Sequence, residues 1–401
     1  MKKLLSLLIA AILTVSIFTT MPVSFAAGGS QTEADDNDDF SSAQLITLGN
    51  SLTGSMPSAL DSDYFKFISK VDGKINISID NLTPNETPQH GRWTFFVYDS
   101  AKKLVAMSEI DLVEKGVTLP FIGAQGGKYY YLSIWAGPGY ASSHSYRIRT
   151  SFTKGKFYEK ESNNSEASAT KYILSKKYTG TVGGDFVDGD GNPCMDIDYF
   201  NIKAPAKGRM TINFNHKKKA PVLYNDGGWY VNLYKHNSSG NLSVSNATLR
   251  INGDADTKVY RASVDKNAEF WFTVQSGFDG NLYGDAYYYG LRSPSDVVGE
   301  PYNITSTFVL AAKPKVSTKA TKNSITLTSK KLSDVTGYEI QFKSGKKFSK
   351  SQFCNKSALK YTKKPLKKNT RYTFRVRAYL KKDGAKYYGN WVAVTAKTKT
   401  K

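Results

Sequence analysis

Glu159-Lys160-Glu161-Ser162-Asn163-Asn164 repeats a stretch that lies 126 positions earlier in the same chain, Glu33-Ala34-Asp35-Asp36-Asn37-Asp38. The match continues without a gap to Thr179-Gly180 in the later copy and to Thr53-Gly54 in the earlier one. Further matches give a period of about 130 to 150 residues, which is too long for a solenoid repeat and is the size of a domain. The sequence therefore predicts two tandem domains of one fold.

A second acidic motif recurs in step with the first, as Asp61-Ser62-Asp63-Tyr64-Phe65 and Asp196-Ile197-Asp198-Tyr199-Phe200. Between the motifs, apolar and polar residues alternate in segments that are rich in aromatic and β-branched side chains, which is typical of β-strands. In the first copy these segments are 63–68, 74–79, 93–98, 129–135 and 146–152. The helical candidates are short, Ser41 to Leu48 and Ala167 to Leu174. An all-β sandwich with one minor helix or turn per copy is the expected fold.

The first 26 residues have the pattern of a signal peptide. Lys2-Lys3 precede an apolar run from Leu4 to Phe18, and Ser24-Phe25-Ala26 supplies a small-residue cleavage site. The run is too short to favour a membrane anchor. We therefore expect residues 1–26 to be removed and the mature protein to be secreted, with non-covalent retention at the cell surface as an option.

The second copy is longer than the first, and its largest insertion, between Gly277 and Tyr302, is rich in tyrosine. Long loops on a sandwich can add function without disturbing the core. Exposed tyrosines are good platforms for sugar rings or peptides. We expect a ligand-binding role for Tyr283, Tyr287, Tyr288 and Tyr289. The alternative is that two of them cap the end of the sandwich.

The ordered motifs Glu-x-Glu-x-Asn-Asn, Thr-Gly, Asp-x-Asp-Tyr-Phe and a later Tyr-x-Ile resemble the bacterial pre-peptidase C-terminal domain. This family includes the collagen-binding modules of clostridial collagenases. The resemblance implies two jelly-roll-like β-sandwiches, at 27–157 and 158–312, as well as secretion and a non-catalytic role. In several members it also implies a calcium site built from the two acidic motifs.

Carried over residue by residue, the resemblance gives calcium ligands in both copies. They are Glu159, Glu161, Asn163, Asn164, Asp196 and Asp198 in the second copy, and Glu33, Asp35, Asn37, Asp38, Asp61 and Asp63 in the first. The chemistry agrees, because calcium takes six to eight oxygen ligands and alternate residues of an extended segment point to one side. The alternative is a solvated acidic linker. Asn164 stands where the first copy has Asp38, which removes one anionic ligand.

The segment 313–401 differs sharply in composition from the rest. It holds 22 Lys and 3 Arg against three acidic residues, a net charge of +22, whereas the whole chain carries +21. In an exported protein such a charge favours anionic wall polymers, acidic glycans or membrane headgroups over nucleic acid. We expect residues 313–401 to tether the protein to an anionic surface. A merely solvated basic face is the alternative.

Four expected strands, 324–328, 337–342, 370–379 and 391–396, resemble those of a fibronectin type III domain, an immunoglobulin-like sandwich. Tyr372 corresponds to the tyrosine-corner residue, whose hydroxyl returns to the backbone just upstream. Ser329 stands where the family usually has a core Trp, and we expect Trp391 to compensate.

Catalytic motifs are missing from the sequence. His90, His144, His216 and His236 show no zinc-helix spacing, and neither a nucleophile elbow nor a phosphate loop occurs. We expect a secreted, non-catalytic protein that binds an extracellular matrix, glycan or cell-wall polymer through calcium-stabilised sandwiches. The alternative is a structural spacer or accessory subunit for a separately encoded hydrolase.

Overall fold

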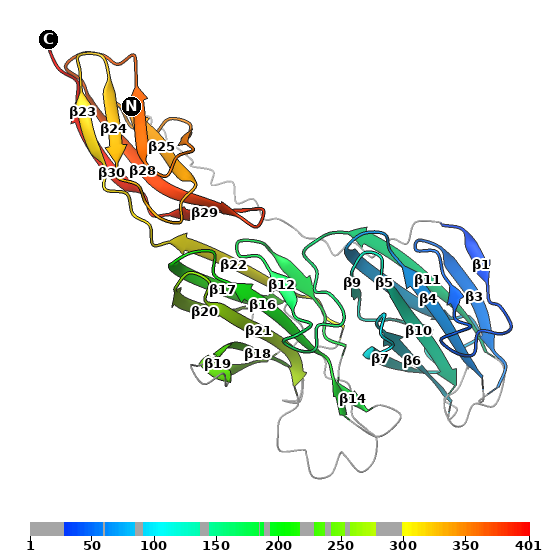
Figure 1. Cartoon of the computed structure of the whole chain (residues 1–401). Coiled ribbons are helices and arrows are strands. Elements are labelled where there is room, and N and C mark those ends of the chain that lie inside the picture. Colours follow the sequence, from blue (N-terminus) through cyan, green and yellow to red (C-terminus); the bar gives the residue numbers. More distant parts are fainter. Residues whose placement is uncertain are drawn as a thin grey trace, which may run out of the picture.

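The computed structural model describes residues 28–58, 61–84, 91–136, 144–183, 185–187, 193–216, 228–236, 242–252, 257–277 and 299–401. Every regular element in these residues is a β-strand. Figure 1 shows the strands gathered into three sandwiches, with the second between the other two. Within the described residues no helix has the length and hydropathy of a membrane span. The all-β sandwich class that the sequence predicts is confirmed.

The first sandwich (residues 28–154) packs two sheets against each other. One has the order β1-β3-β11-β5-β8, with β9 also paired to β5, and the other has the order β2-β4-β10-β6-β7. Its strands are β1 (Ser30–Thr32), β2 (Gln44–Leu45), β3 (Ser51–Met56), β4 (Ser62–Ile68), β5 (Gly73–Asn81), β6 (Arg92–Tyr98), β7 (Leu104–Asp111), β8 (Gly116–Thr118), β9 (Ile122–Ala124), β10 (Tyr129–Ala136) and β11 (His144–Lys154).

Alternation along these strands builds the first core. On β6 the residues Trp93, Phe95 and Val97 are buried, while the residues between them face outward. Tyr130, Leu132 and Ile134 do the same on β10. Because side chains on a strand point alternately to its two faces, one run of sequence supplies both a core and an outer face.

The second sandwich (residues 158–310) repeats this arrangement. One sheet has the order β12-β16-β21-β18-β19, the other contains β20-β17-β22 with β13 also on β22, and β14 and β15 form a separate pair. Its strands are β12 (Thr170–Tyr172), β13 (Tyr178–Gly180), β14 (Asp185–Val187), β15 (Pro193–Met195), β16 (Ile197–Lys203), β17 (Gly208–His216), β18 (Gly228–His236), β19 (Leu242–Asn252), β20 (Thr257–Val264), β21 (Glu269–Gly277) and β22 (Tyr302–Leu310).

The C-terminal sandwich (residues 317–397) pairs a small sheet, β23-β24-β27, with a larger one, β29-β28-β25-β26, in which β30 also lies on β28. Its strands are β23 (Ser317–Ala320), β24 (Ile325–Ser329), β25 (Gly337–Lys343), β26 (Gln352–Cys354), β27 (Leu359–Lys363), β28 (Arg371–Lys382), β29 (Ala385–Gly389) and β30 (Val392–Lys397). β29 also pairs in parallel with β22, so one sheet runs from the second sandwich into the C-terminal one.

Two expectations for the C-terminal core have different outcomes. The hydroxyl oxygen of Tyr372 accepts a hydrogen bond of 3.0 Å from the backbone N–H of Lys367, which confirms the predicted tyrosine corner. The prediction that Trp391 fills the core is wrong, because the core is built from side chains that include Tyr338, Ile340 and Phe374, and Trp391 is not among them. Trp391 instead packs against the guanidinium groups of Arg375 and Arg377.

At 41–48 and 167–174, where the sequence predicts a minor helix or a turn, the structure has a turn followed by a short strand. Within 41–48, Gln44 and Leu45 form β2 and pair in parallel with Phe65 and Lys66. The preceding turn is held by Asp39, whose carboxylate accepts hydrogen bonds from the backbone of Ser41 and Ser42. Short polar side chains that bond the nearby backbone compete with helix formation. In the second copy β12 takes the corresponding place.

Candidate cation site and aromatic face

One tyrosine in each copy joins the two acidic motifs. The hydroxyl of Tyr302 lies 2.6 Å from Asp198 Oδ2 and 3.0 Å from Glu159 Oε2. In the first copy the hydroxyl of Tyr146 lies 2.6 Å from Asp63 Oδ2 and 2.5 Å from Glu33 Oε1. A hydroxyl carries a single proton, so it cannot donate fully to two carboxylates at once. Each pair of acidic groups therefore stays close together with only part of its charge compensated.

The Thr-Gly motif is explained by this contact. A Cβ built on Gly180 would collide with Glu159 Oε2 and with the hydroxyl of Tyr302, and one built on Gly54 would collide with Glu33 Oε2 and the hydroxyl of Tyr146. Glycine is the residue that lets other groups approach the backbone this closely. The next residue then holds the carboxylate, since the backbone N–H of Thr181 donates to Glu159 Oε1 at 2.9 Å.

The second copy adds a third carboxylate to the pair. Oxygen atoms of Glu159, Glu161 and Asp198 all lie within 4.8 Å of one another. Asn163 Nδ2 donates to Asp198 Oδ1 at 2.9 Å, and the backbone N–H of Gly183 donates to Asp196 Oδ2. Three further oxygens are buried and find no hydrogen-bond donor among the described residues: Glu161 Oε2, Asn163 Oδ1 and Asn164 Oδ1. Such a set of oxygens matches the donor chemistry of a hard cation.

Burial dominates the electrostatics of this cluster. It raises the pKa of Glu159 well above its usual range, with a further rise from the negative charge of Asp198. The pKa of Glu161 is raised in the same way by burial and then by Asp196. Burial raises the pKa of Asp198 to about 6, although hydrogen bonds from Tyr302 and Asn163 oppose the rise. Without positive charge among them, these carboxylates are costly to ionise.

In the first copy the predicted ligands are less closely gathered. Asp63 and Asn37 are buried, Glu33 and Asp61 are half-buried, and Asp35 and Asp38 are exposed. Burial raises the pKa of Asp63 to about 9, with Glu33 and Asp61 adding to the rise and the Tyr146 hydroxyl opposing it. Across the described residues, a group of three acidic side chains close enough to share an ion occurs in the second copy and not in the first.

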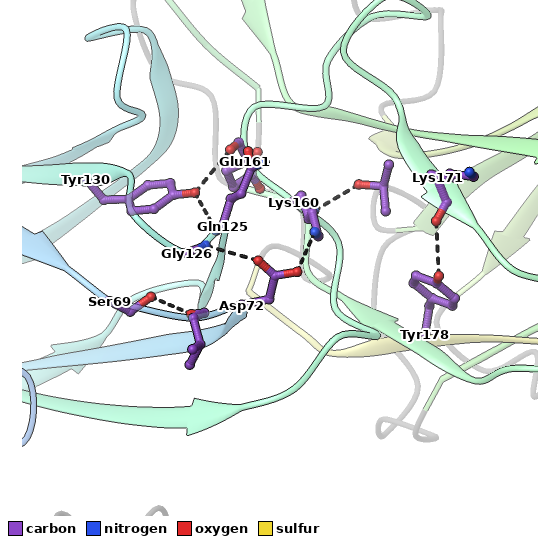
Figure 2. A network of polar contacts seen from close by, with 11 residues as sticks. Ser69, Asp72, Gln125, Gly126, Tyr130, Lys160, Glu161, Lys171 and Tyr178 are labelled. Carbon is purple, nitrogen blue, oxygen red and sulfur yellow. Dashed lines mark hydrogen bonds and ion pairs between the residues drawn. The ribbon is translucent and has the colours of Figure 1, made fainter. Parts of the chain in front are cut away.

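The acidic cluster of the second copy lies where the first and second sandwiches meet. The backbone N–H of Glu161 donates to Gly123 O at 3.0 Å, and the hydroxyl of Tyr130 donates to Glu161 O at 3.2 Å. Figure 2 shows Tyr130 reaching Glu161, and Lys160 paired with Asp72 at 2.6 Å. The residues flanking this junction therefore come from both sandwiches.

A small cavity of about 10 Å³ lies at the same junction. Pro120, Phe121 and Ile122 line it from the first sandwich, and Glu161, Thr181 and Asp196 line it from the second. Its size suits a single water-sized particle. The Thr181 hydroxyl closes one side by donating to Phe121 O at 3.1 Å. The first sandwich thus covers this side of the cluster.

A second feature, which sequence reasoning missed, lies on the outer face of the sheet β2-β4-β10-β6-β7. Six aromatic side chains gather there and are called the aromatic face: Phe40, Tyr64, Phe96, Tyr98, Tyr131 and Trp135. The Phe40 ring lies 5.0 Å from Tyr64, 4.9 Å from Tyr98 and 5.3 Å from Tyr131. Trp135 packs on Phe96 at 5.4 Å and remains 45% exposed.

The signal for the aromatic face was present in the sequence. Segments 93–98 and 129–135 carry aromatic residues at both odd and even positions, so neither sheet face of these strands is purely polar. In the second copy Glu166 takes the position of Phe40, and its carboxylate contacts His236 Nε2 at 2.9 Å. The second copy also carries aromatic side chains on the outer face of the corresponding strands, Tyr199, Tyr230, Tyr234 and Trp271, but it lacks the ring that joins Tyr64, Tyr98 and Tyr131 in the first copy. The predicted ligand residues Tyr283, Tyr287, Tyr288 and Tyr289 lie outside the described residues.

Comparison with known proteins gives limited information. No family model matches the sequence, and no curated protein matches it either. Three similar solved structures are a two-domain fibronectin type III segment from chicken tenascin (14% identity, 53% of this chain and 99% of that chain, TM-score 0.22), the pre-peptidase C-terminal domain of collagenase from Bacillus anthracis (17%, 27% and 93%, 0.22) and a structure described as a myokine (20%, 22% and 97%, 0.18). Domains of both kinds predicted from the sequence are therefore among its structural neighbours. At these TM-scores the likeness carries no argument about function.

Proposed function

We propose that this chain is an exported, non-catalytic protein that captures an extracellular polymer, and that the aromatic face of the first sandwich is one of its contact surfaces. The carrying observation is the aromatic face itself. The solvent side of an antiparallel sheet is normally polar. Here it presents Trp135 at 45% exposure beside half-buried Phe96, Tyr98 and Tyr131.

The aromatic face has the properties of a contact surface for a polymer. Aromatic rings bury a large area with little loss of side-chain entropy, and they dominate the energetics of many interfaces. The rings are also held rigidly, because they lie on three hydrogen-bonded strands, β4, β10 and β6, and are packed edge-on by Phe40. A rigid platform binds an extended polymer without first having to be ordered.

We further propose that the acidic cluster of the second copy holds calcium. The donors fit this ion, since all the candidate ligands are oxygens and three buried ones have no donor among the described residues. Glu159, Glu161, Asp196 and Asp198 would hold it, with Asn163 and Asn164 as amide ligands. The ion would supply positive charge in a place where burial makes uncompensated carboxylates costly. The equivalent first-copy site, with Asp35 and Asp38 exposed, would bind more weakly.

Residues 313–401 complete the proposal as a tether to an anionic surface. Their net charge of +22 in 89 residues contrasts with a nearly neutral remainder. Contacts of this kind weaken as salt rises, because counterions screen and replace them. The C-terminal sandwich would thus hold the protein near its polymer while the first sandwich binds it.

Capture of insoluble polymers by the mature full chain tests the main proposal. We expect retention on at least one of collagen, chitin, cellulose and peptidoglycan, and the double variant Trp135→Ala, Tyr131→Ala should weaken it by about tenfold or more, as loss of an aromatic anchor does. Val71→Ala is the matched control, since Val71 is 40% exposed and lies outside the aromatic face. Retention on none of the four would favour the structural-spacer alternative. Equal loss with Val71→Ala would remove the aromatic face from the proposal.

A further inference from the structure

Cationic and aromatic side chains alternate on the outer face of the large sheet in the C-terminal sandwich. The Arg377 guanidinium lies 3.9 Å from the ring centroid of Tyr388 and 4.4 Å from that of Trp391. The Arg375 guanidinium lies 4.6 Å from Trp391 and 4.2 Å from Phe348. These five residues, together with Lys386 over Phe353 at 3.9 Å, form what we call the cationic–aromatic face.

One edge of each guanidinium group is held by a hydrogen bond. Arg375 Nε donates to Gln341 Oε1 at 2.7 Å, and Arg377 Nε donates to Glu339 Oε2 at 2.7 Å. Glu339 is buried and accepts a further hydrogen bond from Ser351. With Nε occupied and the plane stacked between rings, a guanidinium keeps a fixed orientation. Fixing it in advance reduces the entropy that is lost on binding.

The charge of the cationic–aromatic face is strongly unbalanced. Residues 313–401 contain three acidic side chains, Asp334, Glu339 and Asp383. Glu339 pairs with Arg377 on this face, and Asp334 pairs with Lys266 of the second sandwich at 2.6 Å. Among the described residues, Arg375 has no acidic partner, and its Nε–H donates to the neutral amide of Gln341. The cationic–aromatic face therefore presents oriented positive charge between exposed or half-exposed rings.

We propose that the cationic–aromatic face, and not the lysine-rich loops at the ends of the sandwich, is the binding surface for an acidic polysaccharide. Guanidinium groups bind carboxylate and sulfate groups through two parallel hydrogen bonds, and aromatic rings offer flat apolar surface to sugar rings. This inference rests on the proposed tether and gives it a location and a ligand class. Single-stranded nucleic acid also binds surfaces that combine aromatic and basic side chains. We choose a polysaccharide because the proposed export of the chain would bring it to extracellular polymers.

A purely structural role predicts different behaviour. Stacked arginines and rings can stabilise the outer side of a sheet through cation–π contacts of about 0.5 to 2 kcal/mol. In that case substitution of these arginines or rings would change the melting temperature. Binding of the polymer would then depend only on the net charge of the variant. An Arg→Lys substitution distinguishes the binding role from the structural role, because lysine keeps the positive charge but lacks the planar guanidinium group.

The test measures binding of the mature full chain to polygalacturonate, dextran sulfate and neutral dextran, at about 50 and 200 mM salt. Arg375→Lys keeps the net charge, and we expect it to weaken binding to one or both acidic polymers by about tenfold while leaving melting nearly unchanged. Trp391→Leu should also weaken binding. Lys360→Gln is the control, because Lys360 is exposed on the other sheet, in β27, and its loss removes one charge but no part of this face. That variant should lose less than about twofold.

Each remaining outcome has a defined meaning. If Lys360→Gln weakens binding as much as Arg375→Lys, the attraction is delocalised charge and this inference is overturned, while salt-sensitive tethering still stands. If neither acidic polymer is retained by the unmodified chain, both the inference and the tether fall, but capture by the aromatic face of the first sandwich is unaffected. Tighter binding of single-stranded DNA than of either polymer, with the same dependence on Arg375, would replace the polysaccharide with nucleic acid.

Discussion

At the scale of single residues, the side chains of the repeated acidic motifs are held in place by the groups that contact them. Tyr302 holds Glu159 and Asp198 together, and Gly180 makes room for that contact. Glu161 differs in burial from its counterpart in the first copy, because Asp35 is exposed whereas a carboxylate oxygen of Glu161 is buried without a donor among the described residues. Substitution at these two positions therefore distinguishes a cation site from a solvated acidic segment.

The calcium proposal predicts opposite effects of Glu161→Gln with and without the ion. Calcium at a hundredfold excess over its dissociation constant should stabilise the unmodified chain by about 2.7 kcal/mol, provided that it binds the folded state alone. Glu161→Gln removes a buried carboxyl group that is costly to ionise, so it should raise the melting temperature in chelator and abolish the increase that calcium gives. Calorimetric melts in calcium and in chelator measure both effects.

Asp35→Asn is the matched control for that experiment. It changes the corresponding, exposed position of the first copy, and most of the response to calcium should survive. Identical melting temperatures of the unmodified chain in calcium and in chelator would contradict the proposed site. A full response in Glu161→Gln would place any bound calcium elsewhere.

At the scale of elements, β29 belongs to two sandwiches at once. It pairs with β28 in the C-terminal sandwich and in parallel with Val309 and Leu310 of β22. Tyr387 on this strand is buried in the core of the second sandwich, 5.6 Å from the ring of Phe308. The strand thus docks the C-terminal sandwich through a buried ring as well as through backbone hydrogen bonds.

Tyr387→Ala should loosen this docking. Removal of a buried aromatic side chain costs about 3 kcal/mol or more, and here the cost falls on the contact between sandwiches. We expect trypsin to cleave faster after the exposed Lys315, which lies in the connection between β22 and β23. Tyr388→Ala is the control, since Tyr388 faces the opposite side of the same strand. Equal cleavage rates in the two variants would show that Tyr387 does not secure the docking.

At the scale of the whole molecule, the first two sandwiches meet over buried carboxyl groups. Contacts across the junction include the Lys160–Asp72 ion pair at 2.6 Å and the hydrogen bond from Glu161 N to Gly123 O at 3.0 Å. A part-buried ion pair contributes little to the free energy that holds the two sandwiches together. Burying several carboxylates at the junction costs free energy, and this cost opposes docking of the sandwiches. Under the calcium proposal, the ion determines how firmly the two sandwiches stay together.

Small-angle scattering of the mature full chain should detect this dependence. We expect a larger maximum dimension in chelator than in calcium, because separating the sandwiches returns the carboxylates to water. In Glu161→Gln the difference in maximum dimension between chelator and calcium should shrink, because the substitution removes one carboxylate that would bind the ion. A maximum dimension that is the same in calcium and chelator for the unmodified chain would show that the junction is rigid without the ion.

The sequence alone determined the strands, the repeat and the chemistry of the acidic motifs. Alternation of apolar and polar residues is a local property, so the predicted strands at 63–68, 93–98 and 337–342 are present. The tyrosine corner at Tyr372 was equally predictable, because its partner lies five residues away. Of the minor helix or turn predicted at 41–48 and 167–174, the turn is present, and the residues after it form short strands because they pair with β4 and β16.

Tertiary structure decided which of these residues meet. The Glu161 carboxylate becomes buried because the first sandwich lies against it, and Phe40 completes the aromatic face by packing on rings from three different strands. Trp391 stacks on two arginines instead of entering the core, and β29 extends a sheet of another sandwich. All of these contacts join residues distant in sequence or belonging to different sandwiches. Local pattern carries no information about them, because they depend on how complete sheets and sandwiches pack.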